Sequence, residues 1–124
     1  MGTAGPPFTR ESASALLREV AERLTRLREA LRKIEEHRAA VAQVASSNGG
    51  APHVSEWFGA SREAAGHLAW FGAAGIVVRS VEDGLVDFPA VRAGREIFLC
   101  WRLGEPAVDY WHEADTGFSG RRPL

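Results

Sequence analysis

The 124-residue sequence has little cysteine and no long apolar run. Because Cys100 is its single cysteine, an internal disulfide is impossible, so a reducing cytoplasm is the expected location. No apolar run approaches the roughly 20 residues that a membrane helix needs. The first ten residues also lack the basic and then apolar pattern of a secretory signal. We therefore expect a cytoplasmic protein with no membrane partner.

An excess of charge of either sign is also missing, since the formal net charge is −1. Residues 1–50 hold eight basic and six acidic side chains, and residues 51–124 hold seven and ten. The basic residues of the first part alternate with acidic ones, which is typical of a solvated helix face. A stripe for binding phosphates is not indicated, so we expect no nucleic-acid partner.

Two helices are predicted, over residues 9–46 and 54–74. Thr9 is the expected N-cap of the first. Apolar residues at heptad spacing form a seam along this helix, which must pack on a second helix, on another subunit or on both. The seam consists of Leu17, Val20, Leu24, Leu27, Leu31 and Ile34. The Ser-Ser-Asn-Gly-Gly run at residues 46–50 predicts a loop, so the two helices form an antiparallel hairpin.

After Gly75 the pattern changes to short β-branched and aromatic runs separated by turn residues, which predicts a β-meander over residues 76–112. Residues 113–124 read as an irregular tail. We therefore predict a single domain over residues 1–124 with an α+β fold, in which a long antiparallel helical hairpin packs on a small antiparallel meander.

The C-terminal third of the chain carries the most specific sequence pattern. This block closely resembles a family of small bacterial proteins classified as a domain of unknown function. The resemblance implies the same fold and a prokaryotic cytoplasmic origin, and it implies no reaction. The matching segments are residues 84–89 (GLVDFP), 94–95 (GR), 99–105 (LCWRLGE), 111–113 (WHE) and 117–121 (GFSGR).

The register of the meander follows if both of its turns have two residues, Ala93-Gly94 and Gly104-Glu105. The first turn pairs Asp87 with Cys100, and the second pairs Cys100 with Asp109. One sheet face then carries Val86, Phe88, Ile97, Leu99, Trp101, Val108, Tyr110 and His112, and is expected to pack on the helices. The other face carries Asp87, Phe98, Cys100, Arg102, Asp109 and Trp111.

A divalent metal ion is the first ligand that this register indicates. Asp87, Cys100 and Asp109 lie in one row, and a thiolate between two carboxylates is able to bind such an ion. His112, near a strand end, is a possible fourth ligand, although it falls on the opposite face in this register. The alternative is an ordinary sheet surface on which Arg102 neutralises an aspartate and Cys100 is a small apolar residue.

A small anionic ligand is the second possibility. Arg121 and Arg122 follow a glycine-spaced loop and, with Arg102, offer planar guanidinium groups for a phosphate or carboxylate. The alternative is a tail whose arginines pair with Glu113 or Asp115. The helices add a third possibility, a mixed helix–sheet site that His112 forms with Glu36, His37 and His67.

Three functions remain at this point. The first is a binding module for a metal ion or a small anionic ligand in the C-terminal block. The second is a homo-oligomeric interaction protein, with a dimer favoured, that acts through its helical hairpin. The third is a small enzyme that uses Asp87, Cys100 or His112 for acid–base or nucleophilic chemistry. Substitution of site residues combined with metal analysis separates these functions.

Overall fold

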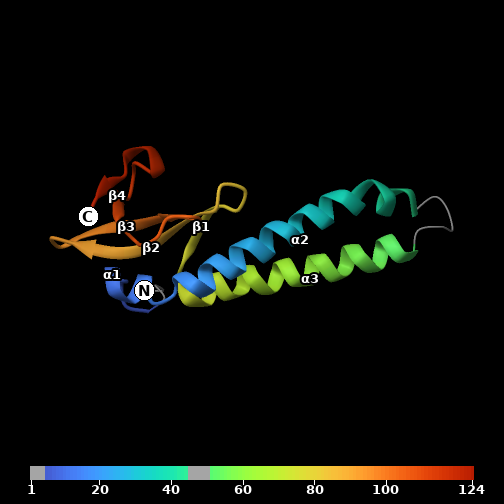
Figure 1. Ribbon diagram of the computed structural model, residues 1–124, viewed down its shortest axis with the longest axis horizontal. Coiled ribbons are helices and arrows are strands. Elements are labelled where there is room, and N and C mark those ends of the chain that lie inside the picture. The colour runs from blue at the N-terminus through green and yellow to red at the C-terminus, as the bar shows by residue number, and fades with distance from the viewer. Residues whose placement is uncertain (1–4, 45–50) are drawn as a thin grey trace.

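The computed structural model describes residues 5–44 and 51–124 (Figure 1). Two long antiparallel helices, α2 (Leu17–Val44) and α3 (Ala51–Ala74), extend away from a five-stranded antiparallel sheet. The α+β fold with a helical hairpin is therefore the one that the sequence predicts. In the described ranges, no helix combines the length and the apolar character needed to cross a bilayer.

The first predicted helix is divided into two. Thr9 caps α1 (Arg10–Ser14), as predicted, and its side chain accepts a hydrogen bond from the backbone of Ser12. The chain then turns at Ala15 and Leu16 before α2 begins. The N–H of Leu16 bonds to the carbonyl of Ala13, three residues back, so the helix tightens and breaks there.

The other predicted helix boundaries are partly testable. The end of the first predicted helix, residues 45–46, and the predicted loop over residues 46–50 lie outside the described residues. The second helix begins at Ala51 instead of residue 54. Its early start includes Pro52, which suits a first helical turn because nitrogen atoms there have no intrahelical acceptor.

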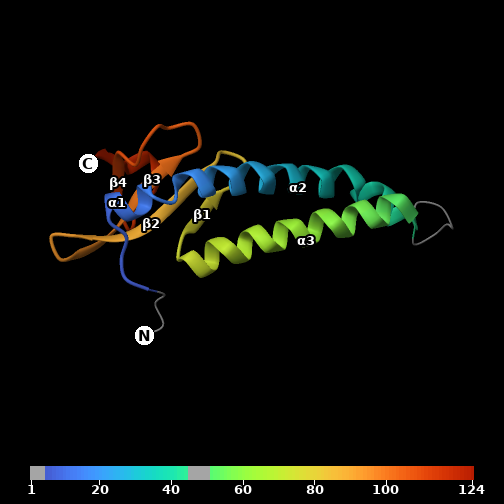
Figure 2. The ribbon, with the colours of Figure 1, turned by 60° about the horizontal axis from the view of Figure 1, so that its bottom comes forward.

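The predicted seam of α2 is buried only along its inner half. Val20, Leu24 and Leu27 are completely buried, whereas Leu31 is 39% exposed and Ile34 is half-buried. Figure 2 shows the reason, since the outer part of the hairpin runs beyond the sheet. The inner half of α2 therefore contributes most of the helical part of the core.

The strands follow one another across the sheet in chain order. The predicted irregular tail is partly ordered, because it contains a single 3₁₀ turn and a short strand that pairs with its neighbour. The elements are β1 (Val77–Ser80), β2 (Leu85–Arg92), β3 (Arg95–Arg102), β4 (Tyr110–Glu113), η1 (Phe118–Gly120) and β5 (Arg122–Pro123).

The turn between β2 and β3 has the two predicted residues, Ala93 and Gly94. Both have a positive φ, 52° and 77°, as a turn that matches the twist of a hairpin requires. Asp87 therefore lies opposite Cys100, and Phe88 opposite Leu99, as predicted.

The predicted register between β3 and β4 is wrong by one residue. Cys100 pairs with Tyr110 instead of Asp109. The chain turns immediately after Arg102, and the ladder then resumes only at Tyr110. Pro106 lies in this connection and has no N–H to donate to a ladder, so the connection is longer than a two-residue turn.

A slip of one residue exchanges the two faces of a strand. Trp111 therefore joins the core, whereas Tyr110 and His112 turn to the face opposite the helices. This correction moves His112 to the same face as Asp87 and Cys100. The core between sheet and hairpin contains Val86, Phe88, Ala90, Ile97, Leu99, Trp101, Val108 and Trp111, with Ala13, Val20, Leu24, Leu27, Ala30, Ala64, Phe71 and Ile76.

Candidate metal site on the outer face of the sheet

Three neighbouring strands bring Asp87, Cys100 and His112 together on the face of the sheet that points away from the helices. Asp87 lies on β2, Cys100 on β3 and His112 on β4. Their exposed fractions are 2%, 1% and 1%. Polar groups buried to this degree need partners inside the protein.

The carboxylate of Asp87 supplies those partners. It lies at hydrogen-bond distance, 2.9 Å, from Nε2 of His112 and accepts a hydrogen bond from Nε of Arg79, on β1, at 2.7 Å. The sulfur of Cys100 lies within 4.8 Å of an oxygen of the same carboxylate. Asp87 is therefore the centre of the cluster.

The orientation of the His112 ring is fixed at both nitrogens. Nδ1 lies 2.7 Å from the backbone carbonyl of Glu113. A carbonyl only accepts, so Nδ1 carries a hydrogen and donates it. Nε2 therefore faces the carboxylate of Asp87. A hydrogen bond between them requires one proton, held either by Nε2 or by the carboxylate.

Cys100 is a thiol in this environment. Burial raises its pKa to about 12, and the neighbouring Asp87 carboxylate adds to the effect. In a nucleophilic triad the histidine bonds to the nucleophile, whereas among the described residues the Nε2 of His112 bonds to Asp87 and not to Cys100. The arrangement therefore does not favour a thiolate nucleophile.

Aromatic and guanidinium groups cover the cluster. The ring of Phe98 lies 5.5 Å from the ring of His112, and the Arg79 guanidinium lies 4.9 Å from the Phe98 ring. Arg79 is 47% exposed, in contrast to the buried carboxylate that it contacts. It is therefore the one member of the Asp87 hydrogen-bond network with a direct path into solvent.

The donor atoms of the cluster match a small metal site in spacing. One oxygen of Asp87, Sγ of Cys100 and a ring nitrogen of His112 all lie within 4.8 Å of one another. Tetrahedral zinc with bonds of about 2.0–2.3 Å has ligand atoms about 3.3–3.8 Å apart. Small side-chain movements therefore suffice to close the three groups around one ion.

Asp109, the fourth predicted ligand, lies elsewhere. Its carboxylate is 2.5 Å from the guanidinium of Arg10, on α1, and its side chain is 42% exposed. The register slip explains its absence, because Asp109 precedes β4 and does not lie opposite Cys100. The predicted row of three across the sheet is therefore wrong in its third member.

Two of the three arginines predicted to bind an anion, Arg102 and Arg121, meet at the ring of Phe118. Arg121 forms an ion pair with Glu105 and its guanidinium lies 3.9 Å from the Tyr110 ring. Arg102 and Arg122 are exposed. The Arg102 guanidinium shares the Phe118 ring with Arg121, and the Arg122 guanidinium shares the Trp111 ring with Arg92. The tail is thus held by Arg121, although its acidic partner is not one of those weighed from the sequence.

The helical histidines form separate groups. His67 contacts Arg23 and Glu63 within the hairpin. His37 lies 2.8 Å from His53, also within the hairpin. The residues described therefore do not form the mixed helix–sheet site with His112.

Arg79 is the cluster residue that sequence reasoning missed. It follows Val77 and Val78 and interrupts a short β-branched run with a long cationic side chain. That interruption was the available signal, since it indicates an acidic partner on the adjacent strand.

Comparison with known proteins gives one match. The family model described as "Uncharacterized conserved protein (DUF2203)" matches residues 7–124. The chain belongs to this family. No curated protein matches the chain, and no solved structure does. The family match agrees with the resemblance seen in the C-terminal block and covers the metal-site cluster in full.

Proposed function

We propose that this chain is a metal-binding module in which Asp87, Cys100 and His112 bind a divalent transition-metal ion. The observation that carries the proposal is the convergence of one oxygen, one sulfur and one nitrogen donor from three adjacent strands. Carboxylate, thiolate and imidazole are all zinc ligands, and together they favour Zn²⁺ over Mg²⁺ or Ca²⁺.

The hydrogen bond at Nδ1 of His112 supports the proposal. Histidines that bind metals usually donate their second ring nitrogen to a carbonyl or carboxylate, which fixes the ring. The Glu113 carbonyl has this role, 2.7 Å from Nδ1. Nε2 is then the atom available to a metal ion.

Metal binding at this cluster must compete with the hydrogen bonds already present. The thiol proton of Cys100 and the proton shared by His112 and Asp87 both have to leave, and the ion replaces part of the contact with Arg79. Because Arg79 is half-exposed, its guanidinium has access to water when the carboxylate turns to the metal. Since protons leave, affinity rises with pH, by about tenfold per pH unit for each proton released.

Titration of the full chain with Zn²⁺ and Co²⁺ tests the proposal. The protein is purified without a histidine tag and treated with a chelator, and binding is followed by calorimetry in two buffers of different ionisation enthalpy. We expect one ion per chain, release of about two protons, and a thiolate-to-Co²⁺ charge-transfer absorption.

Variants then identify the ligands. Cys100→Ser removes the charge-transfer absorption, and His112→Ala weakens Zn²⁺ binding at least about tenfold. Asp109→Asn is the matched control, because this carboxylate lies outside the cluster, and it leaves affinity unchanged. Circular dichroism confirms that each variant is folded. Absence of stoichiometric binding by the wild type, or equal loss in Asp109→Asn, would contradict the proposal.

The outer face of α3 favours a second function, homo-oligomeric interaction. Phe58 is 57% exposed and Leu68 is 47% exposed. Gly59 and Gly66 have open space where a Cβ would lie, so nothing in the described chain requires glycine there. Exposed large apolar side chains are typical of interaction surfaces, and small residues allow close helix approach.

A second copy of the chain fits this face by charge. Arg62 and Glu63 lie near the middle of α3, so a two-fold related helix presents each charge to its opposite. Gly66→Ala tests this. On a solvent-exposed helix it stabilises the protein by about 1 kcal/mol, whereas in a close-packed dimer it weakens association. A wild type that stays monomeric in sedimentation equilibrium at high concentration would contradict the second function.

A further inference from the structure

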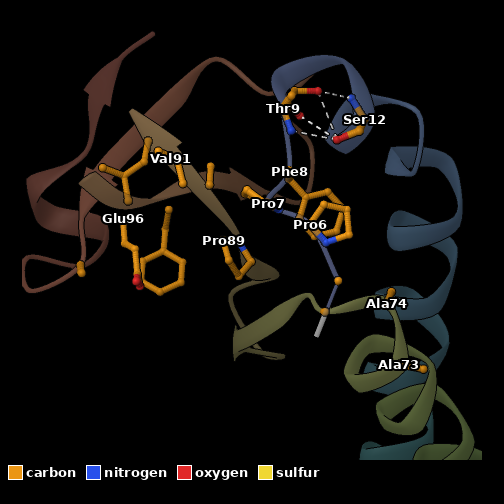
Figure 3. Close-up of a pocket in the computed structure, with 16 residues that line it drawn as sticks. Pro6, Pro7, Phe8, Thr9, Ser12, Ala73, Ala74, Pro89, Val91 and Glu96 are labelled. Carbon is orange, nitrogen blue, oxygen red and sulfur yellow. Dashed lines mark hydrogen bonds between the residues drawn. The ribbon is translucent and has the colours of Figure 1, made fainter. Parts of the chain in front are cut away.

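A second site is indicated next to Phe98, the residue whose ring also contacts His112. A hollow of about 640 Å³ lies between the segment that precedes α1, the C-terminal end of α3, and the hairpin of β2 and β3. Figure 3 shows Ala73 and Ala74 on one side of it, with Val91 and Glu96 on the other. Its volume lies in the range of about 300–1,000 Å³ typical of small-molecule sites.

The hollow exists because no strand continues alongside the second half of β2. The last pair between β1 and β2 is Val77 with Asp87. Beyond it, the N-terminal segment makes one bridge, in which the N–H of Phe8 bonds to the carbonyl of Pro89 at 2.8 Å. Pro6, Pro7 and Pro89 have no N–H, so they cannot extend that bridge into a ladder.

The wall of the hollow is mostly carbon. Its large side chains are Pro6, Pro7, Phe8, Pro89, Val91, Ile97 and Phe98. The hydroxyl groups of Thr9 and Ser12 also line it, but they bond to each other and to the backbone in the cap of α1. The hollow therefore suits an apolar ligand, because both of these hydroxyl groups already have hydrogen-bond partners.

Glu96 is the ionisable side chain of this wall, among the residues that the structure describes. It is exposed, and none of the described ion pairs includes it. A carboxylate beside an apolar hollow selects a molecule that carries a positive charge next to an apolar group.

We propose that this hollow binds a small hydrophobic amine, with an aromatic or branched aliphatic body against Phe8, Ile97 and Phe98 and an ammonium group at Glu96. This proposal does not depend on a bound metal ion. Phe98 contacts His112 and also lines the hollow, so we expect a bound amine to shift the position of the His112 ring.

Three matched probes test the proposal on the full chain in the presence of a chelator. They are 2-phenylethylamine, 2-phenylethanol and 3-phenylpropanoate, which have similar bodies and carry positive, zero and negative charge. Binding is measured by ¹H–¹⁵N chemical-shift titration. We expect the amine to bind most tightly and the acid most weakly, with shifts concentrated at residues 73–75 and 96–98.

Two variants and one control complete the test. Glu96→Gln reduces the affinity for the amine about two- to fivefold, to that of the alcohol, as expected for an exposed ion pair. Ala73→Trp fills the hollow from an exposed helix position and removes binding of all three probes. Asp115→Asn removes an exposed carboxylate outside the hollow and changes nothing.

Equal binding of amine and acid, or an unchanged preference in Glu96→Gln, would overturn the assignment of an amine. Shifts confined to other surfaces, or no saturable binding of any probe, would overturn the site itself. Because the chelator removes metal ions throughout, neither result bears on the Zn²⁺ proposal, and failure of Zn²⁺ binding does not affect this test.

Discussion

Cys100 is expected to control how stability depends on pH in alkali. Its pKa is raised to about 12 in the folded protein from an ordinary value of 9.0. The unfolded chain therefore loses the thiol proton first, so stability is complete below about pH 9 and falls as pH rises toward 12. The expected slope is about 1 kcal/mol per pH unit.

Urea unfolding of the wild type and of Cys100→Ala, between pH 8 and pH 10.5, measures this slope. The variant has no thiol to ionise and is expected to lack that part of the pH dependence. Identical slopes in the two proteins would show that Cys100 ionises as easily in the folded chain as in the unfolded one.

Alanine is expected to destabilise the protein more at Gly84 than at Gly94, although both glycines lie in turns with a similar φ. Both have a positive φ, 70° and 77°. A Cβ on Gly84 would lie 2.6 Å from Cβ of Leu103, whereas one on Gly94 would meet nothing within 4 Å. We expect Gly94→Ala to cost about 1 kcal/mol, from the backbone alone, and Gly84→Ala about 2 kcal/mol more. Midpoints of urea unfolding compare the two, and equal costs would contradict the clash at Leu103.

The residues of the Asp87–Cys100–His112 cluster were predictable where strand pairing is local. Asp87 and Cys100 flank a hairpin whose turn residues specify its length, so their contact follows from the sequence. Tyr110 takes the place opposite Cys100 that was expected for Asp109, because the second connection is longer than a two-residue turn. The partner of Asp109 is Arg10, 99 positions away along the chain, and spacing along a sequence does not predict such a contact.

At the scale of elements, α2 is expected to differ in sensitivity along its length. Leu24 is completely buried and Leu31 is 39% exposed, although both belong to one seam. Leu24→Ala is expected to lower the free energy of unfolding by about 2–5 kcal/mol, and Leu31→Ala by about 1 kcal/mol or less. Chemical denaturation measures both. A large loss at Leu31 would instead indicate that a partner covers the outer hairpin.

Element boundaries were predictable where turn-forming or capping residues mark them. Thr9 and the Ala93-Gly94 turn were placed correctly for this reason. The break between α1 and α2 carries neither glycine nor proline, and it depends on the packing of Ala13 in the core and on the tightened turn at Leu16. Tertiary packing decides such a break, so local pattern did not reveal it.

For the whole molecule, Phe8 is expected to connect the start of the chain to the sheet. Its ring lies 5.2 Å from the ring of Phe88 in an edge-to-face contact, and its N–H bonds to Pro89. Phe8→Ala is expected to cost about 1–3 kcal/mol. Val91→Ala is the control, since Val91 is 53% exposed, and we expect it to change stability by less than about 0.5 kcal/mol. Thermal unfolding compares them, and equal effects would contradict this role of Phe8.

The arrangement of the whole molecule was predictable in class and not in detail. Periodicity separates the helical and β regions, because apolar spacing differs between a helix and a strand. The hollow was not visible in this way, since it depends on the N-terminal segment returning to β2. Pro6 and Pro7 suggested only a loose lead-in, although the structure places them in the wall of a cavity.

The part of the hairpin that extends beyond the sheet is expected to unfold separately from the rest of the molecule. Trp57 lies on this outer part of α3, whereas Trp101 and Trp111 lie in the core between the sheet and the hairpin. Helical turns that touch only each other open more readily than turns anchored in the core. Fluorescence from Trp57 is therefore expected to change at a lower temperature than fluorescence from the sheet tryptophans, and non-coincident melting curves would divide the chain into two cooperative units.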